Sequence, residues 1–333
     1  MRNIAATATA TSDTAIEMRH VVKYFDQKRP LSLFRREDVR VYALDDVSFT
    51  LERGEFCAYA GPNGAGKSTT FKLLSGMLVP QSGEVRAFGM APDEHRIPLM
   101  RRAGVLFGNR SELWWDHPVR ASFEWKKVVW DVPDDMYREN LGMLRELLGL
   151  GEFWNSFARE LSLGQRMKAN LALMLLHAPE LVLLDEPTLG LDVLAKRQMI
   201  DFLKHINAER GVTILVTSHD MDDLTEMAKR LILINKGTLA FDGDHQKLMR
   251  VAGDRRILRV ETRGGAPDIP GAKLLSQTGA ACEYEYDALE MPTARLFAAL
   301  AAEEGIVDAE IVRAPIERVI ADLYRKWQGE AVS

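Results

Sequence analysis

The feature that most constrains this chain is a glycine-rich run that ends in lysine, serine and threonine, Gly61-Pro62-Asn63-Gly64-Ala65-Gly66-Lys67-Ser68-Thr69. The glycines allow successive backbone N–H groups to turn inward and form a concave nest for phosphate oxygens. Lys67 can bring a positive charge to the outer phosphates of a nucleotide, and the Ser68 hydroxyl is placed to ligate Mg²⁺. The run therefore predicts that the chain binds a nucleoside triphosphate together with Mg²⁺.

The residues around this run predict an α/β fold. Residues 55–60 are strand-like and lead into the glycines, and residues 68–76 are typical of a helix. Strand, glycine loop and helix is the context in which this motif binds phosphate. Residues 181–184 and 212–217 are continuous apolar runs, as expected of strands buried on both faces of a parallel sheet, and the segments before them, 118–160 and 162–177, are helical in pattern. Strands that alternate with helices indicate an α/β nucleotide-binding fold.

Composition narrows the class of protein. Apolar residues make up 47% and charged residues 27% of the 333 residues, as in a soluble globular protein. The net charge of −5 counts against nucleic acid as the main partner. Cys57 and Cys282 have no metal-binding spacing, and we interpret them as buried residues of a reducing compartment. The longest nearly apolar stretch, 171–184, is interrupted by polar residues and proline, so we expect any action on a membrane to go through a partner.

A basic insertion lies between the first two strand-like regions. Residues 28–40 contain five arginines and lysines against two acidic residues. We interpret this segment as a solvated loop, with a surface for anionic lipid or a partner as the alternative.

A pair of carboxylates follows one of the buried strands. Asp185 and Glu186 come directly after the apolar run 181–184. A carboxylate at the end of a buried strand can hold Mg²⁺, often through water, opposite the phosphate loop. The next carboxylate can polarise the attacking water as a general base. The simpler alternative is that the pair only begins a turn.

A third motif identifies the family that the chain resembles. The run Leu161-Ser162-Leu163-Gly164-Gln165 is similar to the signature sequence of ABC-type ATPases, which is close to Leu-Ser-Gly-Gly-Gln. The order of motifs also resembles that family: phosphate loop, signature, acidic strand end and then a histidine, His219. The segment after Pro187-Thr188, which includes Asp192, looks like the family's D-loop. The resemblance covers residues 17–245 and implies the P-loop core of an ABC ATPase, with an antiparallel β subdomain and a helical subdomain at about 90–165.

The resemblance implies a role for each matching residue. Lys67 and Ser68 bind the phosphates and Mg²⁺, and Asp185 holds Mg²⁺ indirectly. Glu186 is the general base, and His219 contacts the γ-phosphate and orients water, with a histidine that only caps a strand end as the alternative. Asn109 occupies the position of the Q-loop glutamine, near nucleotide and Mg²⁺, and Phe25 stacks on adenine unless the neighbouring Tyr24 does. Ser162, Gly164, Gln165 and Asp192 complete the nucleotide contacts.

Two departures from the family pattern stand out. Asn109 is one methylene shorter than the usual glutamine, so we expect it to reach Mg²⁺ only through water. Leu163 replaces the first glycine of the signature, whereas Gly164 is retained. Neither change implies an inactive protein.

One chain carries one phosphate loop and one signature. Because the start of the helix after Ser162 can bind the γ-phosphate of an opposite subunit, the resemblance implies a head-to-tail dimer that closes on ATP. The resemblance also implies a separate membrane permease as partner, action on the inner face of the cell membrane and, from the layout, export. An import system and an ABC ATPase acting on nucleic acid or ribosomes are the alternatives.

Tryptophans concentrate in the expected helical subdomain. Five of the six lie within residues 114–154, and we place Trp114-Trp115-Asp116 at or beside the permease contact. Ordinary core aromatics are the alternative interpretation.

The sequence predicts three parts. Residues 1–16 form a disordered tail, 17–245 an ABC ATPase domain and 246–333 a small α+β accessory domain. In the last part we expect strands at 255–262, near 282–286 and at 309–313, with helices at 292–304 and 315–328.

Overall fold

The structure is a computed structural model that describes residues 13–32, 35–108, 110–218, 220–253, 255–303, 305–313, 320 and 323. The chain divides into two compact units, Met1–Asp242 and Gly243–Ser333. Each unit has its own hydrophobic core. The sequence predicts a domain boundary at 245/246, close to this division.

A six-stranded sheet forms the centre of the first unit, in the order β5-β6-β7-β3-β8-β9. Neighbouring strands from β5 to β8 run parallel, and every residue of β3 and β7 is buried. Full burial explains why these strands are almost entirely apolar. The predicted strands before the glycine loop and at 181–184 and 212–217 are confirmed. The strands are β3 (Phe56–Ala60), β5 (Ala103–Phe107), β6 (Leu181–Asp185), β7 (Thr213–Thr217), β8 (Arg230–Asn235) and β9 (Thr238–Asp244).

A second, antiparallel sheet in this unit has the order β2-β1-β4, with β1 (Thr14–Ser32), β2 (Arg35–Glu52) and β4 (Ser82–Ala87). The predicted disordered tail, residues 1–16, is wrong at its end, because β1 begins at Thr14. Ala15 and Ile16 are buried, and Ile16 pairs with Leu51 on one side and Ala87 on the other. The apolar Ile16 gains burial there, whereas residues 1–12 lie outside the described residues.

In its described residues, 28–32 and 35–40, the basic insertion is not the loop that the sequence predicts. Its two halves continue β1 and β2 as a paired ladder, in which Lys28 lies opposite Asp38 and Asp26 opposite Arg40. The Arg40 guanidinium lies 4.0 Å from the centre of the Tyr24 ring. Cross-strand pairs of opposite charge and cation–aromatic contacts stabilise such a hairpin, and the charge count alone does not reveal this pairing.

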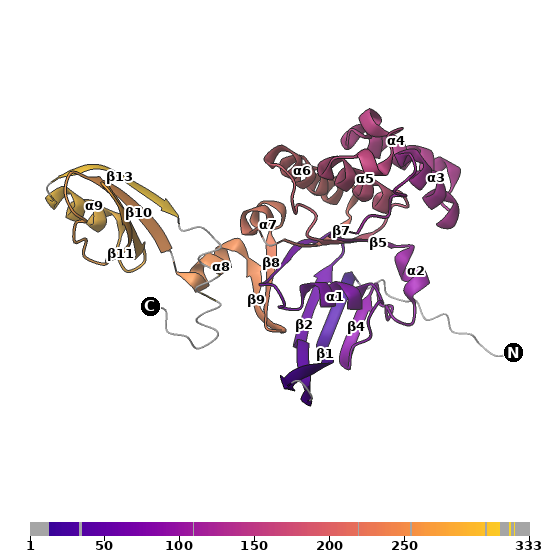
Figure 1. Ribbon diagram of the computed structural model, residues 1–333, viewed down its shortest axis with the longest axis horizontal. Coiled ribbons are helices and arrows are strands. Elements are labelled where there is room, and N and C mark those ends of the chain that lie inside the picture. Colours follow the sequence, from indigo (N-terminus) through magenta and orange to yellow (C-terminus); the bar gives the residue numbers. More distant parts are fainter. Residues whose placement is uncertain are drawn as a thin grey trace. The chain divides into compact units, whose positions relative to one another are not determined.

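Helices gather on one side of the first unit, away from the antiparallel sheet (Figure 1). The predicted helical subdomain at about 90–165 begins too early, because β5 is a strand of the central sheet; α5 matches the helix predicted at 162–177. The run Ala103–Phe107 contains Gly104, and glycine is depleted in strands, so this run is a weaker strand signal than the others. The helices on this side are α3 (Val119–Val129), α4 (Asp134–Leu147), α5 (Leu163–Leu175) and α6 (Val193–Arg210).

The remaining helices of this unit are short: α1 (Lys67–Leu74), α2 (Arg96–Met100), α7 (Met221–Met227) and the 3₁₀ turns η1 (Leu150–Phe153) and η2 (Ala158–Glu160). None of the helices in the described ranges combines the length and the apolar character that a membrane crossing requires.

The second unit is an antiparallel sheet in the order β11-β12-β10-β13 with α9 packed against it. Leu296 and Leu300 of α9 share a core with Leu258, Val260 and Tyr284. The strands expected at 255–262, 282–286 and 309–313 and the helix at 292–304 are all present, whereas β11 and α8 were not predicted. The expected helix at 315–328 lies almost entirely outside the described residues. The elements are α8 (His245–Ala252), β10 (Arg255–Thr262), β11 (Ala272–Thr278), β12 (Ala281–Asp287), α9 (Thr293–Ala302) and β13 (Ile306–Arg313).

A histidine beyond α5 connects the helices to the central sheet. The His177 ring stacks on Trp130 with the ring centres 4.6 Å apart, and its Nε2 lies 3.3 Å from the Ala103 carbonyl oxygen of β5. Burial, and secondly the charge of Lys126, lower the pKa of His177 from 6.5 to about 4. The folded protein therefore favours the neutral ring.

This shift makes folding stability depend on pH. Between about pH 6.5 and 4 the unfolded chain takes up a proton at His177 that the folded chain does not, so stability falls as the pH is lowered, with a slope of up to about 1.4 kcal/mol per pH unit. We expect His177→Gln, whose amide can still reach the Ala103 carbonyl, to flatten this part of the profile. Thermal denaturation of both proteins from pH 7 to pH 4 tests this, and parallel profiles would contradict it.

Candidate nucleotide-binding site

The glycine loop lies where strand β3 ends and helix α1 begins, and two of its glycines cannot be replaced without a clash. A Cβ on Gly61 would lie 2.3 Å from the Ile234 carbonyl oxygen, and one on Gly66 would lie 2.3 Å from the Ala43 carbonyl oxygen. Gly66 also has φ of 114°, a conformation that other residues avoid. Packing against β8 and β2 thus requires glycine at both positions.

Helix α1 begins at Lys67 without a side-chain cap on its first turn among the described residues. The unpaired N–H groups of a helix start attract anions, so the loop and α1 together form a site for phosphate. Lys67 is 7% exposed, and its Nζ donates to the carbonyl oxygens of Gly61 at 2.6 Å and Pro62 at 3.2 Å. A phosphate oxygen would be a stronger acceptor for this ammonium than either carbonyl.

Burial lowers the pKa of Lys67, and the negative charges of Glu186 and then Asp185 oppose that shift. The three side chains are therefore electrostatic neighbours. The ammonium therefore contacts the phosphate loop and feels the charges of the two carboxylates at the end of β6.

Asp185 joins the phosphate loop to two strand ends. Its Oδ2 accepts a hydrogen bond from Ser68 Oγ at 2.9 Å, and its Oδ1 accepts one from Thr217 Oγ1 at 2.7 Å. Its backbone carbonyl accepts from the N–H of Gly108, which follows β5, at 2.8 Å. The parallel pairing of β5, β6 and β7 makes these contacts possible, because their carboxyl ends meet at one edge of the sheet.

Glu186 adopts a strained backbone conformation directly beside this edge. Its φ is 55°, in the left-handed region, which costs a non-glycine residue about 1–3 kcal/mol. Its N–H is held by Thr217, with 3.0 Å to Oγ1 and 3.2 Å to the carbonyl oxygen. Such strain persists where the surroundings enforce it, and it occurs frequently at catalytic positions.

The signature-like run begins helix α5. Ser162 is its N-cap: Ser162 Oγ accepts from the Gln165 N–H at 3.2 Å, and Gln165 Oε1 accepts from the Ser162 N–H at 3.0 Å. This reciprocal capping box explains both residue types structurally. The next N–H groups, at Leu163 and Gly164, belong to the first turn, where anions bind.

Asp192 caps the following helix, α6, through a 2.8 Å hydrogen bond from the Ala195 N–H to its Oδ1. Close by, Leu163 packs against Gly190, where an added Cβ would lie 2.8 Å from Leu163 Cδ2. The leucine that departs from the family signature is therefore in contact with the segment that resembles the D-loop.

Three further residues have predicted nucleotide contacts. Phe25 lies on β1, half exposed, with the Lys23 ammonium 5.4 Å from its ring centre. Asn109 and His219 lie outside the described residues. The nucleotide roles proposed for these three residues stay predictions.

The sequence did not single out Thr217, Tyr59 or Thr70. Thr217 contacts both Asp185 and Glu186, although the only signal for it was its position at the end of an apolar run. Tyr59 OH lies 3.0 Å from Thr70 Oγ1, which donates to the Gly66 carbonyl at 3.2 Å. This buried chain of hydroxyl groups ties β3 to α1 around the loop.

The chain resembles known proteins over most of the first unit. Residues 44–189 match the family described as ABC transporter. The chain is 32% identical to EcfA of Methanothermobacter thermautotrophicus, an energy-coupling factor transporter ATP-binding protein, over 63% of this chain and 68% of that one. The corresponding protein of Methanoculleus marisnigri is 30% identical over 78% of this chain and 92% of its own length. YbhF of Escherichia coli, a probable multidrug ABC transporter ATP-binding protein, is 36% identical over 60% of this chain, which spans only 34% of that protein.

Solved structures confirm the predicted fold class. The dimeric ATP-binding cassette MJ0796, bound to ADP and Pi, superimposes with a TM-score of 0.60 at 23% identity, over 69% of this chain and 98% of that one. CbiO1 of Clostridium perfringens gives a TM-score of 0.61 at 23% identity, over 72% and 92%.

The loop geometry leads to a direct test. Gly61→Ala places a Cβ within 2.3 Å of a backbone oxygen, so we expect the loop to shift and the affinity for a fluorescent ATP analogue to fall at least about tenfold. Gly142→Ala is the matched control, because a Cβ there meets nothing within 4 Å and alanine favours the helix. Equal affinities for the two variants, measured by fluorescence anisotropy, would contradict this view of the loop.

Proposed function

Because the chain belongs to the family of ABC transporter ATP-binding proteins, we propose that it hydrolyses ATP and powers transport through a separate membrane permease. The observation that carries the chemistry is the network at the carboxyl edge of the sheet. There Ser68, Asp185 and Thr217 are hydrogen bonded in series, with Lys67 and Glu186 beside them. Phosphate-binding, metal-binding and proton-accepting groups converge on one place.

The residues at this edge fit Mg²⁺. Ser68 Oγ and Asp185 Oδ2 lie 2.9 Å apart, and both are hard oxygen donors of the kind that Mg²⁺ prefers. No cluster of three acidic, histidine or cysteine side chains is found in the part of the chain that the structure describes, which suits an ion held mainly by water and substrate phosphates. When bound, Mg²⁺ neutralises charge on the phosphates. In this proposal Ser68 ligates the ion, Asp185 orients it through water, and Asn109 adds a distant contact.

Glu186 is the proposed general base. Thr217 accepts hydrogen bonds from the backbone N–H of Glu186. The end of the central sheet therefore fixes where the Glu186 backbone lies relative to the phosphate loop. A carboxylate in this place can accept a proton from water as the water attacks the γ-phosphate. Lys67 stabilises the outer phosphates, and His219 is the proposed second contact to the γ-phosphate.

We propose that two chains close on ATP head to tail. The first turn of α5 would bind the γ-phosphate held by the partner copy. The surroundings of this turn support an interface, because Leu163 is 44%, Val193 85% and Leu194 68% exposed. Leu163 contacts Gly190, close in sequence to the other two, and exposed apolar side chains gathered in one region mark interaction sites.

The proposed permease contact lies beside α3. A groove of about 480 Å³ between α2, β5 and α3 includes the exposed Ile97 and Val129. Trp115 is 52% exposed and Val128 77%, which favours an interface over the core interpretation of the tryptophans in this segment. Through such a partner the chain would act on the inner face of the membrane.

For the direction of transport we propose export. The relatives carry names from two transporter classes, multidrug for YbhF and energy-coupling factor for EcfA. The support for export is the layout of one ATPase unit followed by a small α+β unit. Import is the second candidate. The observation behind it is that the chain matches 92% of the length of the Methanoculleus marisnigri protein, which is named for the energy-coupling factor class.

The proposed base can be tested by Glu186→Gln. The amide cannot accept the proton, so we expect ATP turnover to fall at least about 100-fold while ATP still binds. The variant should accumulate as an ATP-dependent dimer, detected by light scattering after gel filtration. The exposed Glu94→Gln serves as control. Turnover by Glu186→Gln within about threefold of the unmodified protein would remove Glu186 from this role.

The permease can be sought with the same variant. We expect Glu186→Gln protein, mixed with ATP and Mg²⁺ and detergent-solubilised membranes of the native cells, to capture a multi-span protein in stoichiometric amount, identified by mass spectrometry. Adding Trp115→Ala should reduce this capture without lowering the melting temperature. Loss of thermal stability with unchanged capture would favour the core interpretation. Ribosomal or DNA-binding proteins in place of a membrane protein would favour the nucleic-acid alternative. Transport assays with the captured protein would then decide between export and import.

A further inference from the structure

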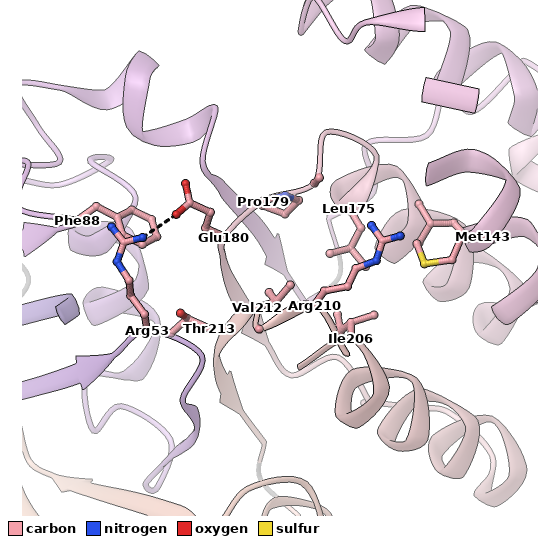
Figure 2. A pocket seen from close by; sticks show the side chains of 13 residues that line it. Arg53, Phe88, Met143, Leu175, Pro179, Glu180, Ile206, Arg210, Val212 and Thr213 are labelled. Carbon is pink, nitrogen blue, oxygen red and sulfur yellow. Dashed lines mark hydrogen bonds and ion pairs between the residues drawn. The ribbon is translucent and has the colours of Figure 1, made fainter. Parts of the chain in front are cut away.

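A second pocket opens at the edge of the central sheet that is opposite the phosphate loop. Glu180, Val212 and Arg53 line it, and each lies just before a parallel strand, β6, β7 or β3 (Figure 2). The phosphate loop follows the carboxyl end of β3, so this pocket lies at the amino ends of the same strands. We call it the amino-end pocket. Its volume of about 510 Å³ is in the range of small-molecule sites.

The pocket wall is apolar where the helices contribute to it. Leu144 of α4, Leu175 of α5 and Ile206 of α6 line it but are themselves at most 7% exposed, so the accessible apolar lining comes mainly from Met143, Phe88 and Ala178. Side chains from helices and from the segment before β6 thus give part of the pocket wall an apolar surface. A ligand held here would place an aliphatic body against it.

Two arginines stand at opposite ends of this surface (Figure 2). Arg53 donates to Glu180 at 2.9 Å, and Arg102 also donates to Glu180, with Nε at 2.6 Å. The guanidinium groups of Arg53 and Arg102 lie 5.0 Å and 4.0 Å from the centre of the Phe88 ring. The Glu180 carboxylate therefore already pairs with two guanidinium groups at this end of the pocket.

Arg210, at the other end, has weaker partners. Its Nη1 donates to the neutral Asn140 Oδ1 at 3.0 Å, and its Nη2 is 4.0 Å from the exposed Glu139 carboxylate. Figure 2 shows its guanidinium beside Met143 and Leu175. A guanidinium next to apolar side chains, with an exposed carboxylate partner as far as 4.0 Å away, can still anchor an anion.

The charged side chains at the pocket determine which net charge of a ligand is favoured. Counted with their charged partners, Arg53, Arg102 and Arg210 are positive and Glu139 and Glu180 are negative, so one positive charge is in excess. This balance favours a monoanion, and Glu180 would repel a dianion such as a phosphate monoester.

Two lining residues are also strained. Phe88 and Ala178 have φ of 50° and 53°, in the left-handed region that side chains other than those of glycine and asparagine rarely adopt. Strained residues cluster at ligand sites, where the surrounding structure enforces them. Both residues line the pocket, which adds to the argument from shape and charge.

We propose that the amino-end pocket binds an organic monoanion that has a carboxylate on an aliphatic body. The carboxylate pairs with Arg210, and the aliphatic chain lies along Met143 and Ala178, lining residues that have accessible apolar atoms. Such a ligand would contact helices α4 and α6, and it leaves the phosphate loop unobstructed. The proposal is independent of the proposed function, because it concerns the opposite edge of the sheet.

Titration calorimetry of the full chain with decanoate tests this. We expect one site per chain, and at least tenfold weaker binding for Arg210→Gln and for 1-decanol, which lacks the charge. Arg138→Gln is the matched control: Arg138 lies on the same helix as Leu144, is exposed and does not line the pocket. Its affinity for decanoate should be unchanged.

A second variant separates loss of the site from loss of the fold. Met143 is half exposed on the pocket wall, so Met143→Trp should fill the pocket and abolish decanoate binding while the melting temperature stays near that of the unmodified protein. No saturable binding by the unmodified chain, or equal decanoate affinity in Arg210→Gln and Arg138→Gln, would overturn the proposal. Because the readout is binding without nucleotide, either result leaves the ATPase proposal unaffected.

Discussion

The hydrogen bonds accepted by Asp185 hold the proposed catalytic edge together. Its carboxylate receives the hydroxyl groups of Ser68 and Thr217, and its carbonyl receives the Gly108 N–H. One residue thus connects helix α1, strand β7 and the segment after β5. These contacts require β5, β6 and β7 to end at the same level, which parallel pairing ensures. A slip in register would separate the phosphate loop from the carboxylates.

Close packing around this edge explains its unusual backbone. Gly61 and Gly66 approach backbone oxygens too closely for any side chain, and Glu186 stays in a left-handed conformation that isolated residues avoid. The free energy that offsets this strain comes from the sheet, whose strands β3 and β7 are buried along their whole length. The amino-end pocket shows the same combination, with strained Phe88 and Ala178 beside buried apolar walls. Both edges of one sheet therefore offer positions for ligands.

Sequence reasoning succeeded where spacing and periodicity are distinctive. The glycine spacing located the phosphate loop, and the apolar runs at 181–184 and 212–217 located two central strands. It failed where a signal depends on a distant partner. β5 contains Gly104, which weakens its strand signal. The basic insertion pairs across a hairpin, and Ile16 joins a sheet because both Leu51 and Ala87 are beside it. Thr217 was missed for the same reason, since its importance comes from Asp185 and Glu186.

The sequence by itself determined the chemistry available to this protein. Glycines at 61 and 66, the adjacent lysine and serine, and the paired carboxylates specify a phosphate-binding loop and acidic groups, because these roles depend on residue type and local spacing. Tertiary structure alone decided which groups meet. It placed Ser68 against Asp185, and Thr217 against both Asp185 and Glu186. It also brought Arg53 and Arg210, which are far apart in the sequence, to the same pocket. Contacts between segments separated by a hundred residues or more follow from strand order and helix packing, which no local pattern encodes.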